Sequence, residues 1–274
     1  LELDLGQPAE VKKLNQYEFD AILHLAGQSS GEVSFHDPEY DFNSHVISTF
    51  QLLLLCKKKN IKRFLYASSM GIYGEPKSLP VKESTQLLPK SYYGAAKLCA
   101  ENYLNLYNKF GIETTAFRMF NVYGPNEYHK NDQMSVICKL YPQVTAGAAA
   151  KLFKSPHPDY EDGGQLRDFV YVRDCVDVMC WLYDNPNVSG LFNVGTGKAR
   201  SFKDLALATF TAADKEPKIN YIDMPQALQG KYQYFTEANM DKLREAGYSR
   251  DFTSLEEGVR DYVQNYMSQD DPYR

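Results

Sequence analysis

Three short runs of apolar residues dominate the first half of the sequence, at positions 21–27, 63–69 and 114–122. Each run is rich in residues that favour strands, and each is followed by small or polar residues. Runs that are apolar at nearly every position are typical of strands buried on both faces. We therefore expect three strands of one sheet that is covered on both sides.

Segments of helical length lie between these runs. Residues 40–59 carry apolar side chains at Val46, Phe50 and Leu53, and residues 93–110 show the same helical period. Strands that alternate with helices predict right-handed βαβ units and a parallel sheet. Ligands of such sheets bind beyond the carboxyl ends of the strands, so the residues that follow each run are the candidates for a site.

The second part of the chain has a different pattern. Residues 126–166 are rich in loop-forming Pro and Gly, and one further strand–turn–helix unit follows at 191–204. Within that unit Ser201 and Asp204 are three residues apart, as in a capping box at the start of a helix. We predict an α/β fold in which a Rossmann-type parallel sheet is joined to a smaller C-terminal α/β substrate lobe.

The composition excludes several classes of protein. Of the 274 residues 43% are hydrophobic and 24% are charged, which is the balance of a globular chain. The net charge of −5 argues against nucleic acid as a partner, because binding to phosphates needs a basic face. No stretch reaches the ~20 apolar residues of a membrane span, and the first residues do not have the pattern of a signal peptide.

The cysteines form no recognisable metal or disulfide pattern. Their number is odd and no CxxC pair occurs among Cys56, Cys99, Cys138, Cys175 and Cys180. Because no His lies near enough to complete a zinc site, we predict no bound metal. Reduced, buried thiols and a cytoplasmic location are the expectation.

One combination of residues predicts acid/base chemistry. Tyr93 and Lys97 are four residues apart in a predicted helix and share one face, and Ser69 ends a predicted strand upstream. The pKa of a Tyr hydroxyl is ~10, but a nearby ammonium and a cationic nicotinamide ring would lower it. Ser69 would then orient a substrate hydroxyl whose proton Tyr93 accepts. A Tyr and a Lys at this spacing also occur by chance. The prediction of acid/base chemistry therefore depends on Ser69 as well.

Six spaced motifs carry a resemblance to a known family: HLAG at 24–27, YASSMGIYG at 66–74, YYGAAK at 92–97, RMFNVYGP at 118–125, RDFVYVRD at 167–174 and FNVGTG at 192–197. The chain resembles extended short-chain dehydrogenases/reductases of the nucleotide-sugar epimerase and dehydratase group. Residues 20–125 look most like UDP-hexose 4-epimerases. Residues 119–262 are more similar to ADP-glyceromanno-heptose 6-epimerases, and in this family the second half normally chooses the sugar nucleotide.

The resemblance implies roles for individual residues. It implies that Tyr93 is catalytic, with Lys97 as its partner and Ser69 on the substrate side. Cofactor contacts are implied for Asp4, Leu5, Leu25, Ala26, Gly27, Gln28, Ser29, His45, Lys97 and Val122. Contacts to the sugar nucleotide are implied for Ser69, Asn121, Lys130, Asp132, Lys139, Phe153, Lys154, Ser155, Pro156, Arg167 and Tyr232.

Two of these positions have competing interpretations. Arg167 suits a phosphate clamp because its planar guanidinium pairs with two oxygens, but a structural ion pair with Asp168 or Asp174 is the alternative. Lys130, in the pair His129-Lys130, matches the Lys that acts as a second acid/base in heptose epimerases. The alternative for Lys130 is a solvated loop lysine.

The chain also departs from the family pattern. The Gly-rich GxxGxxG loop that cradles a pyrophosphate is absent, as are the first two strands and the residue that selects NAD or NADP. His45 stands where the group usually has Asn, which puts one ribose or amide contact in question. The predicted division is 1–125 for the Rossmann-type domain and 126–274 for the substrate lobe, with 167–197 returning to the first domain.

The function implied by this resemblance is epimerisation of ADP-glycero-manno-heptose at C6, through transient oxidation to a keto sugar and re-reduction. NADP is the expected cofactor and NAD the alternative. UDP-hexose 4-epimerisation and a non-catalytic sugar-nucleotide- or NADP-binding protein are the competing functions. We expect a nucleotide sugar as partner, neither nucleic acid nor a membrane, and a homo-oligomer.

Overall fold

The computed structural model describes residues 1–226 and 233–271, without the side chain of Asp132. Its main sheet has four parallel strands in the order β1-β2-β3-β8. These strands are β1 (Ala21–His24), β2 (Arg63–Ser69), β3 (Glu113–Met119) and β8 (Gly190–Val194). The predicted α/β fold with a Rossmann-type parallel sheet is confirmed.

The carboxyl ends of these strands meet at one edge of the sheet. His24, the last residue of β1, pairs with Tyr66, while Ser69 at the end of β2 pairs with Met119 at the end of β3. Met119 in turn pairs with Val194, the last residue of β8. The residues that follow the strands are therefore brought together at the edge where the sequence predicted a site.

The apolar run at 114–122 forms two strands instead of the single predicted one. β3 ends at Met119, and β4 (Asn121–Tyr123) pairs with β7 (Phe169–Tyr171) outside the main sheet. Between them Phe120 is buried, and its backbone N–H donates a 3.0 Å hydrogen bond to the carbonyl oxygen of Val194. Because β8 ends there, the chain beyond Phe120 has no strand of the main sheet left to pair with.

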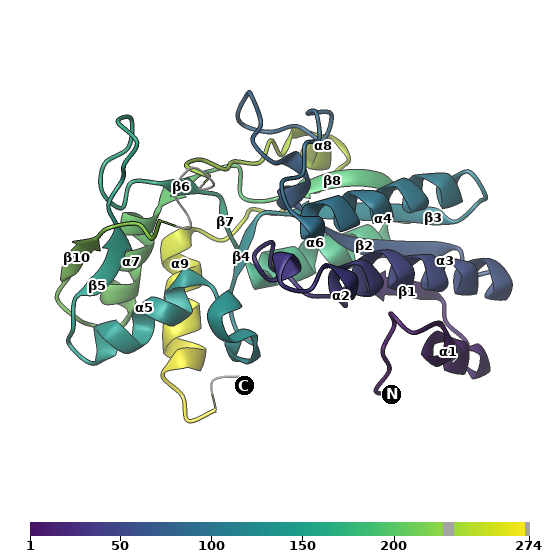
Figure 1. Ribbon diagram of the computed structural model, residues 1–274, viewed down its shortest axis with the longest axis horizontal. Coiled ribbons are helices and arrows are strands. Elements are labelled where there is room, and N and C mark those ends of the chain that lie inside the picture. Colours follow the sequence, from purple (N-terminus) through teal and green to yellow (C-terminus); the bar gives the residue numbers. More distant parts are fainter. Residues whose placement is uncertain (227–232, 272–274) are drawn as a thin grey trace.

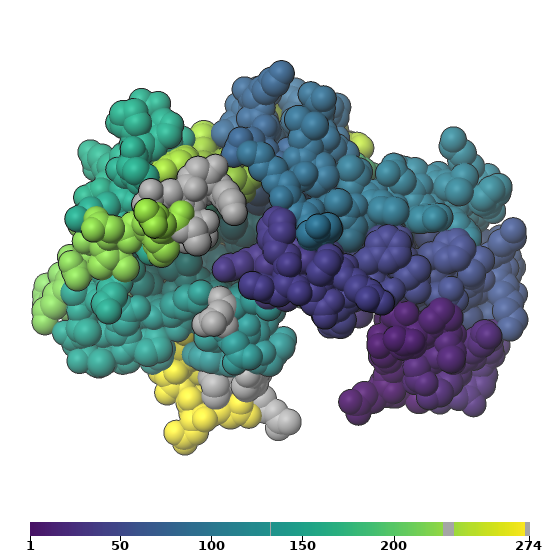
Figure 2. All heavy atoms as spheres, viewed as in Figure 1, coloured from purple at the N-terminus to yellow at the C-terminus, as the bar shows by residue number. Residues whose placement is uncertain are grey.

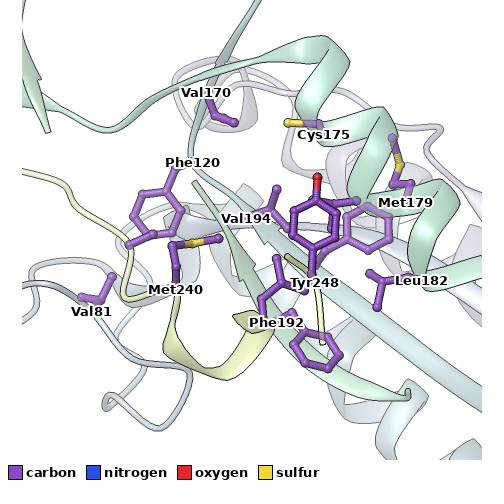
Figure 3. Packing of buried hydrophobic residues seen from close by; sticks show 14 of the residues in the cluster. Val81, Phe120, Val170, Cys175, Met179, Leu182, Phe192, Val194, Met240 and Tyr248 are labelled. Carbon is purple, nitrogen blue, oxygen red and sulfur yellow. The ribbon is translucent and has the colours of Figure 1, made fainter. Parts of the chain in front are cut away.

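Helices cover both faces of the main sheet (Figure 1). Along β2, Phe64 and Tyr66 pack among side chains of two helices on one face, whereas Leu65 packs among side chains of a third helix on the other. Figure 3 shows the cluster that contains Leu65, in which Met179 and Leu182 of the third helix belong together with the strand residue Phe192. The three helices are α3 (Ser48–Lys59), α4 (Tyr92–Asn108) and α6 (Val172–Asp184).

The predicted helices begin and end close to the expected positions. α4 begins after Ser91, whose hydroxyl accepts a hydrogen bond within the first turn. The segment predicted as one helix over 40–59 is divided into α2 (Pro38–Phe42), a π-helical turn (Asn43–Ile47) and α3. It ends at Asn60, which has a left-handed φ of 59°.

A second group of elements surrounds two smaller apolar clusters at the other end of the molecule (Figure 1). The capping box predicted at Ser201 and Asp204 is confirmed at the start of the helix that begins at Phe202. Figure 2 shows the same arrangement from outside, with teal and green residues on one side and purple and blue residues on the other. The elements are α5 (Val136–Thr145), β5 (Ala150–Phe153), β6 (Leu166–Arg167), β9 (Arg200–Ser201), α7 (Phe202–Ala212), β10 (Ile219–Ile222) and α9 (Leu255–Tyr262), with α1 (Pro8–Val11) and α8 (Asp241–Glu245) elsewhere.

The five cysteines are free thiols in the structure. The thiols of Cys56, Cys138 and Cys175 are buried as predicted, whereas Cys99 is only partly buried. The prediction is wrong for Cys180, which is exposed on α6 because Val178, Met179 and Leu182 face the core from that helix. Among the described helices, none combines the length and apolarity that crossing a membrane requires.

Candidate active site

The carboxyl ends of the main strands open into a cavity of about 620 Å³. One part of its wall is formed by the segments after β1 and β2 and by α4, and other parts by β4, the loop that follows it, α5, α6 and α7. Ten of the residues predicted for the site line this cavity: Leu25, Gly27, Gln28, Ser29, Ser69, Tyr93, Lys97, Asn121, Val122 and Lys130.

Ser69 and Tyr93 meet where β2 ends. The hydroxyl of Ser69 accepts a hydrogen bond of 3.1 Å from the backbone N–H of Gly71, which orients it. Burial raises the pKa of the Tyr93 hydroxyl, and a hydrogen bond with Ser69 opposes that rise. In the protein without ligands, burial outweighs this hydrogen bond. The lowering of the Tyr93 pKa by Lys97 together with a cationic nicotinamide stays a prediction. Tyr93 is protonated at neutral pH.

The ammonium of Lys97 lies beneath Tyr93 and is almost entirely buried. It donates a hydrogen bond of 2.8 Å to the carbonyl oxygen of Ala67 and lies 5.7 Å from the centroid of the Tyr93 ring. Burial lowers the pKa of Lys97 to about 7, while Asp41 and Glu101 act in the opposite direction. Lys97 is thus held against the end of β2. Because its pKa is near 7, it can lose its proton at neutral pH.

A buried ion pair behind this site was not anticipated from the sequence. The guanidinium of Arg118 on β3 donates two hydrogen bonds to the carboxylate of Glu101 on α4, at 3.0 and 2.7 Å. The hydroxyl of Ser68 on β2 donates to the same carboxylate. The pair therefore joins both strands to the helix that carries Tyr93 and Lys97. The signal in the sequence is Arg118, the one charged residue in the run at 114–122.

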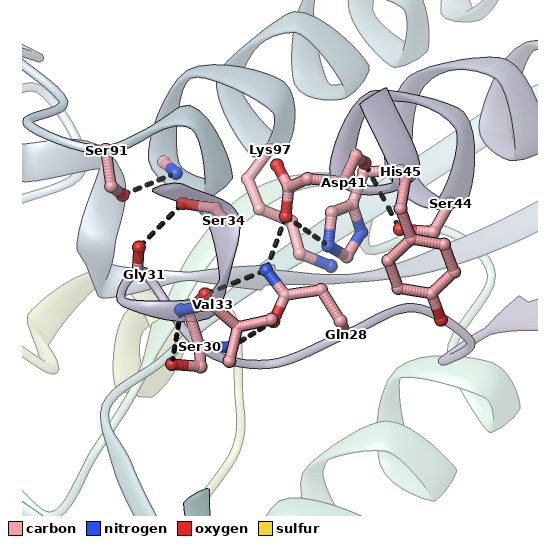
Figure 4. A network of polar contacts seen from close by, with 12 residues as sticks. Gln28, Ser30, Gly31, Val33, Ser34, Asp41, Ser44, His45, Ser91 and Lys97 are labelled. Carbon is pink, nitrogen blue, oxygen red and sulfur yellow. Dashed lines mark hydrogen bonds and ion pairs between the residues drawn. The ribbon is translucent and has the colours of Figure 1, made fainter. Parts of the chain in front are cut away.

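A second polar network links the loop after β1 to the helical segment that follows it (Figure 4). The amide of Gln28 donates to one carboxylate oxygen of Asp41, and Nε2 of His45 lies 3.7 Å from that oxygen. The His45 ring packs edge-on against the Tyr93 ring, with centroids 5.3 Å apart. Asp41 and its link to Gln28 were also missed by the sequence analysis.

His45 lies behind the cavity wall. Its side chain is fully buried, and burial, with a smaller contribution from Lys97, lowers its pKa to about 3, so the imidazole is neutral. Gly27 separates it from the cavity, because a Cβ at Gly27 would lie 2.4 Å from Cε1 of His45. A direct cofactor contact by His45 remains a prediction, and the structure places the ring beside Tyr93.

Asn121 and Lys130 reach the cavity from β4 and the loop that follows it. The side-chain oxygen of Asn121 accepts a 3.1 Å hydrogen bond from the hydroxyl of Thr236, so its orientation is fixed. Lys130 lies in the 3₁₀ segment Tyr128–Gln133. These two residues approach from other elements than Tyr93, as expected for a site that surrounds a sugar.

Five other predicted substrate residues lie in the second group of elements and do not line the cavity. The ammonium of Lys154 pairs with Asp223 at 2.9 Å. The guanidinium of Arg167 lies 5.5 Å from the Phe202 ring and donates to a backbone carbonyl oxygen. Asp168, one of the two alternative partners of Arg167, accepts hydrogen bonds from the N–H groups of Thr196, Gly197 and Ala238. The residues concerned are Phe153, Lys154, Ser155, Pro156 and Arg167.

Other predicted positions are dispersed. Asp4 accepts a 2.9 Å hydrogen bond from the N–H of Gly6, and Leu5 lines a separate apolar groove beside β1. Ala26 belongs to that groove as well, and Lys139 is exposed on α5. Tyr232 and the side chain of Asp132 are outside the described residues.

The sheet, the Ser69–Tyr93–Lys97 arrangement and the cavity agree with a comparison of the sequence with known families. A model of the NAD dependent epimerase/dehydratase family matches residues 1–195. The chain belongs to this family. The resemblance identified from the six motifs is thereby confirmed.

Individual members of the epimerase/dehydratase family are similar over most of the chain. The ADP-L-glycero-D-manno-heptose-6-epimerase of Nitratidesulfovibrio vulgaris strain DP4 is 46% identical over 94% of this chain and 79% of its own. The UDP-N-acetylglucosamine 4-epimerase of Methanobrevibacter ruminantium superimposes with a TM-score of 0.82 at 27% identity, covering 95% and 80%. The ADP-L-glycero-D-manno-heptose-6-epimerase of Helicobacter pylori gives a TM-score of 0.78 at 26% identity, covering 97% and 78%.

The residues around the cavity fit the nicotinamide half of the cofactor that the family name implies. Tyr93 and Lys97 present a hydroxyl and an ammonium to the cavity, groups suited to bind ribose hydroxyls. The backbone of residues 27–29 and the apolar side chain of Val122 complete the wall. We therefore assign NAD or NADP chemistry to this family member, with Tyr93, Lys97 and Val122 as the residues that would hold the ring and its ribose.

Proposed function

We propose that this chain acts as an ADP-L-glycero-D-manno-heptose 6-epimerase. The observation that carries the proposal is the meeting of Ser69, Tyr93, Lys97 and Lys130 around one cavity. The heptose epimerase of N. vulgaris, with 46% identity over 94% of this chain, supports the same substrate. The reaction inverts C6 of the heptose by oxidation and re-reduction of that carbon.

The proposed tasks of the side chains concern proton movement and orientation. Ser69 hydrogen-bonds to the sugar hydroxyl, and Tyr93 exchanges a proton with the oxygen of that hydroxyl. Lys97 stabilises the charge that develops on Tyr93 when it loses its proton. A bound nicotinamide cofactor would accept the hydride and return it. Because burial keeps Tyr93 protonated, the protein alone is prepared for the step in which the sugar oxygen gains a proton.

Lys130 would be the second acid/base group. It enters the cavity from a different element than Tyr93, so the two side chains can serve different presentations of the same sugar carbon. An epimerase must deliver hydride to either face of one carbon. If the sugar binds in two orientations, Tyr93 can exchange a proton with it in one orientation and Lys130 in the other. A UDP-hexose 4-epimerase with a rotating sugar would need only Tyr93.

We further propose NADP as the cofactor, with NAD as the alternative, and a division into a cofactor domain at 1–125 and a substrate lobe at 126–274. The pairing of β8 with β3 and the packing of α6 on the main sheet support a return of 167–197 to the cofactor domain. The cofactor choice can be tested by denaturing the purified natural protein and identifying the dinucleotide released.

A homo-oligomer is also proposed. Leu54, Leu106 and Phe110 are large apolar side chains that remain exposed on or directly after α3 and α4. Covering them with a second copy would remove apolar surface from water. Sedimentation equilibrium with Leu106→Glu beside the unchanged protein would test this, since a charge at a shared interface shifts the protein toward monomer.

The decisive experiment compares two substrates and one substitution. With the proposed function, the natural protein interconverts the two C6 epimers of ADP-glycero-manno-heptose, and Lys130→Met slows this by about 10²–10⁴-fold. The competing function, UDP-hexose 4-epimerisation, is supported by the similarity in fold to the M. ruminantium enzyme. Conversion of UDP-galactose, with less than about a tenfold effect of Lys130→Met, would replace the proposal by that function.

A further inference from the structure

The buried carboxylate of Glu127 ties together the two ends of the loop that carries Lys130. Glu127 is 5% exposed and lines the cavity. Its carboxylate accepts two hydrogen bonds from Ser135, one from the backbone N–H at 2.7 Å and one from the hydroxyl at 2.6 Å. A longer bond of 3.5 Å comes from the N–H of Gly124. One side chain thus joins position 124 to position 135.

Lys130 lies midway between these two attachment points. Its backbone N–H donates a 2.9 Å hydrogen bond to the carbonyl oxygen of Glu127. On either side of it, Asn126 and Asn131 have left-handed φ angles of 69° and 50°. A chain that changes handedness twice cannot continue as a helix, so its path depends on contacts made from outside the loop.

Ser135 is the other half of this clamp. It precedes α5, its side chain makes no capping bond to that helix, and its hydroxyl donates to Glu127. The carboxylate therefore lies at the N-terminal end of α5, where the helix dipole favours a negative charge. This arrangement fixes the point at which the loop enters a helix of ten residues.

We infer that Glu127 is a positioning residue for Lys130, an inference that rests on the acid/base role proposed for Lys130. The two bonds to Ser135 fix the end of the loop, and the end of the loop fixes where the Lys130 ammonium meets the sugar. A misplacement of about 1 Å at a reacting group can cost about 10²-fold in rate. Loss of Glu127 should therefore act on the rate through Lys130.

The chain offers a matched control for loss of a buried carboxylate clamp. Asp174 is 7% exposed and accepts two hydrogen bonds of 2.8 Å from Thr253, again from the backbone N–H and the hydroxyl. It does not line the cavity. Asp174→Asn should therefore affect stability as the Glu127 variants do, without displacing Lys130.

The test measures kcat, KM and the melting temperature of the natural protein on ADP-heptose. Glu127→Ala should lower kcat by about 10–100-fold, with KM changed by less than about threefold. The double variant with Lys130→Met should be no slower than Lys130→Met alone, because no lysine remains to be positioned. Asp174→Asn should lower the melting temperature and keep kcat within about threefold of the unchanged protein.

If Glu127→Ala fails to fold, Glu127→Gln retains one acceptor oxygen for Ser135, and the same comparison with Lys130→Met is made. A double variant that shows the product of the two single losses would overturn the inference. So would an unchanged kcat in Glu127→Ala beside an impaired Lys130→Met, and in both cases the role of Lys130 would stand. Full activity of Lys130→Met would overturn the proposed function and this inference together.

Discussion

The ammonium of Lys97 donates a 2.8 Å hydrogen bond to the carbonyl oxygen of Ala67, two residues before Ser69. This contact connects the helix that carries Tyr93 with the strand that ends in Ser69. It also places a cation in a position that is almost fully buried, since Lys97 is 5% exposed. Burial of that charge costs stability, and the cost depends on pH.

We expect the free energy of unfolding of the cofactor-free protein to rise with pH between about 7 and 10.5 through Lys97. The unfolded chain keeps this side chain protonated up to its ordinary pKa of 10.5, whereas the folded protein releases the proton near pH 7. The unfolded state therefore binds more protons in this window, and stability increases by at most about 1.4 kcal/mol per pH unit.

Urea denaturation at several pH values within that window checks this expectation. Lys97→Met lacks the titrating group, so the stability of the unchanged protein should increase relative to this variant as the pH rises. Parallel curves for the two proteins would show that Lys97 keeps its proton when folded.

Tyr93→Phe should lower kcat by about 10²–10⁴-fold, because it removes the hydroxyl that exchanges a proton with the sugar. Tyr92 is the matched control, since it is the preceding residue on the same helix and is 53% exposed. Tyr92→Phe should leave kcat unchanged, and both variants should retain their far-ultraviolet circular dichroism. Turnover of Tyr93→Phe within threefold of the unchanged protein would exclude the proposed acid/base role and favour a non-catalytic binding protein.

Gly27→Ala should lower the free energy of unfolding by about 1–3 kcal/mol and weaken cofactor binding. Gly27 has a φ of 134°, and its new Cβ would lie 2.4 Å from Cε1 of His45. Gly111→Ala is the comparison, because Gly111 also has a positive φ, of 80°, but no atom lies within 4 Å of its Cβ position.

The difference between these two variants in chemical denaturation isolates the contact with His45 from backbone strain. Because His45→Ala removes a buried side chain and is destabilising by itself, the comparison is made within that background: there Gly27→Ala should cost about as much as Gly111→Ala. Equal losses for Gly27→Ala and Gly111→Ala would mean that the close approach of His45 is unimportant for stability.

Arg118→Met should destabilise the fold by about 3–5 kcal/mol, since it leaves the buried carboxylate of Glu101 without its partner. The double variant Arg118→Met/Glu101→Leu should lose less than Arg118→Met alone, because no unpaired charge remains. Lys90→Met breaks the exposed pair with Glu75 and should change stability by less than about 1 kcal/mol. A double variant less stable than the single one would show that the pair stabilises by more than charge compensation.

The part of the site that lies within one motif was predictable from the sequence. Tyr93 and Lys97 share a helical face wherever that helix packs, because four residues make about one turn. Ser69 joins them because a strand buried in a parallel sheet delivers its carboxyl end to the ligand-binding edge. The order of strands and helices therefore predicted both the fold class and the edge at which the cavity opens.

The contacts that orient these groups depend on residues far apart in the chain. The pair Glu101–Arg118 forms because α4 lies across β3, and Asp41 meets Gln28 only where the segment before α3 packs against the loop after β1. The pKa of Tyr93 follows from burial in the assembled protein, which a spacing of residues does not reveal.

Local periodicity and the geometry of parallel sheets were enough to predict that Ser69, Tyr93 and Lys97 meet at one edge of the sheet. Three features became visible only in the folded chain: the run at 114–122 divides at Phe120, His45 lies behind Gly27, and Glu127 clamps the Lys130 loop. Burial and the hydrogen bonds between distant segments arise when separate elements pack together, so they are properties of the folded chain and of no single segment of it.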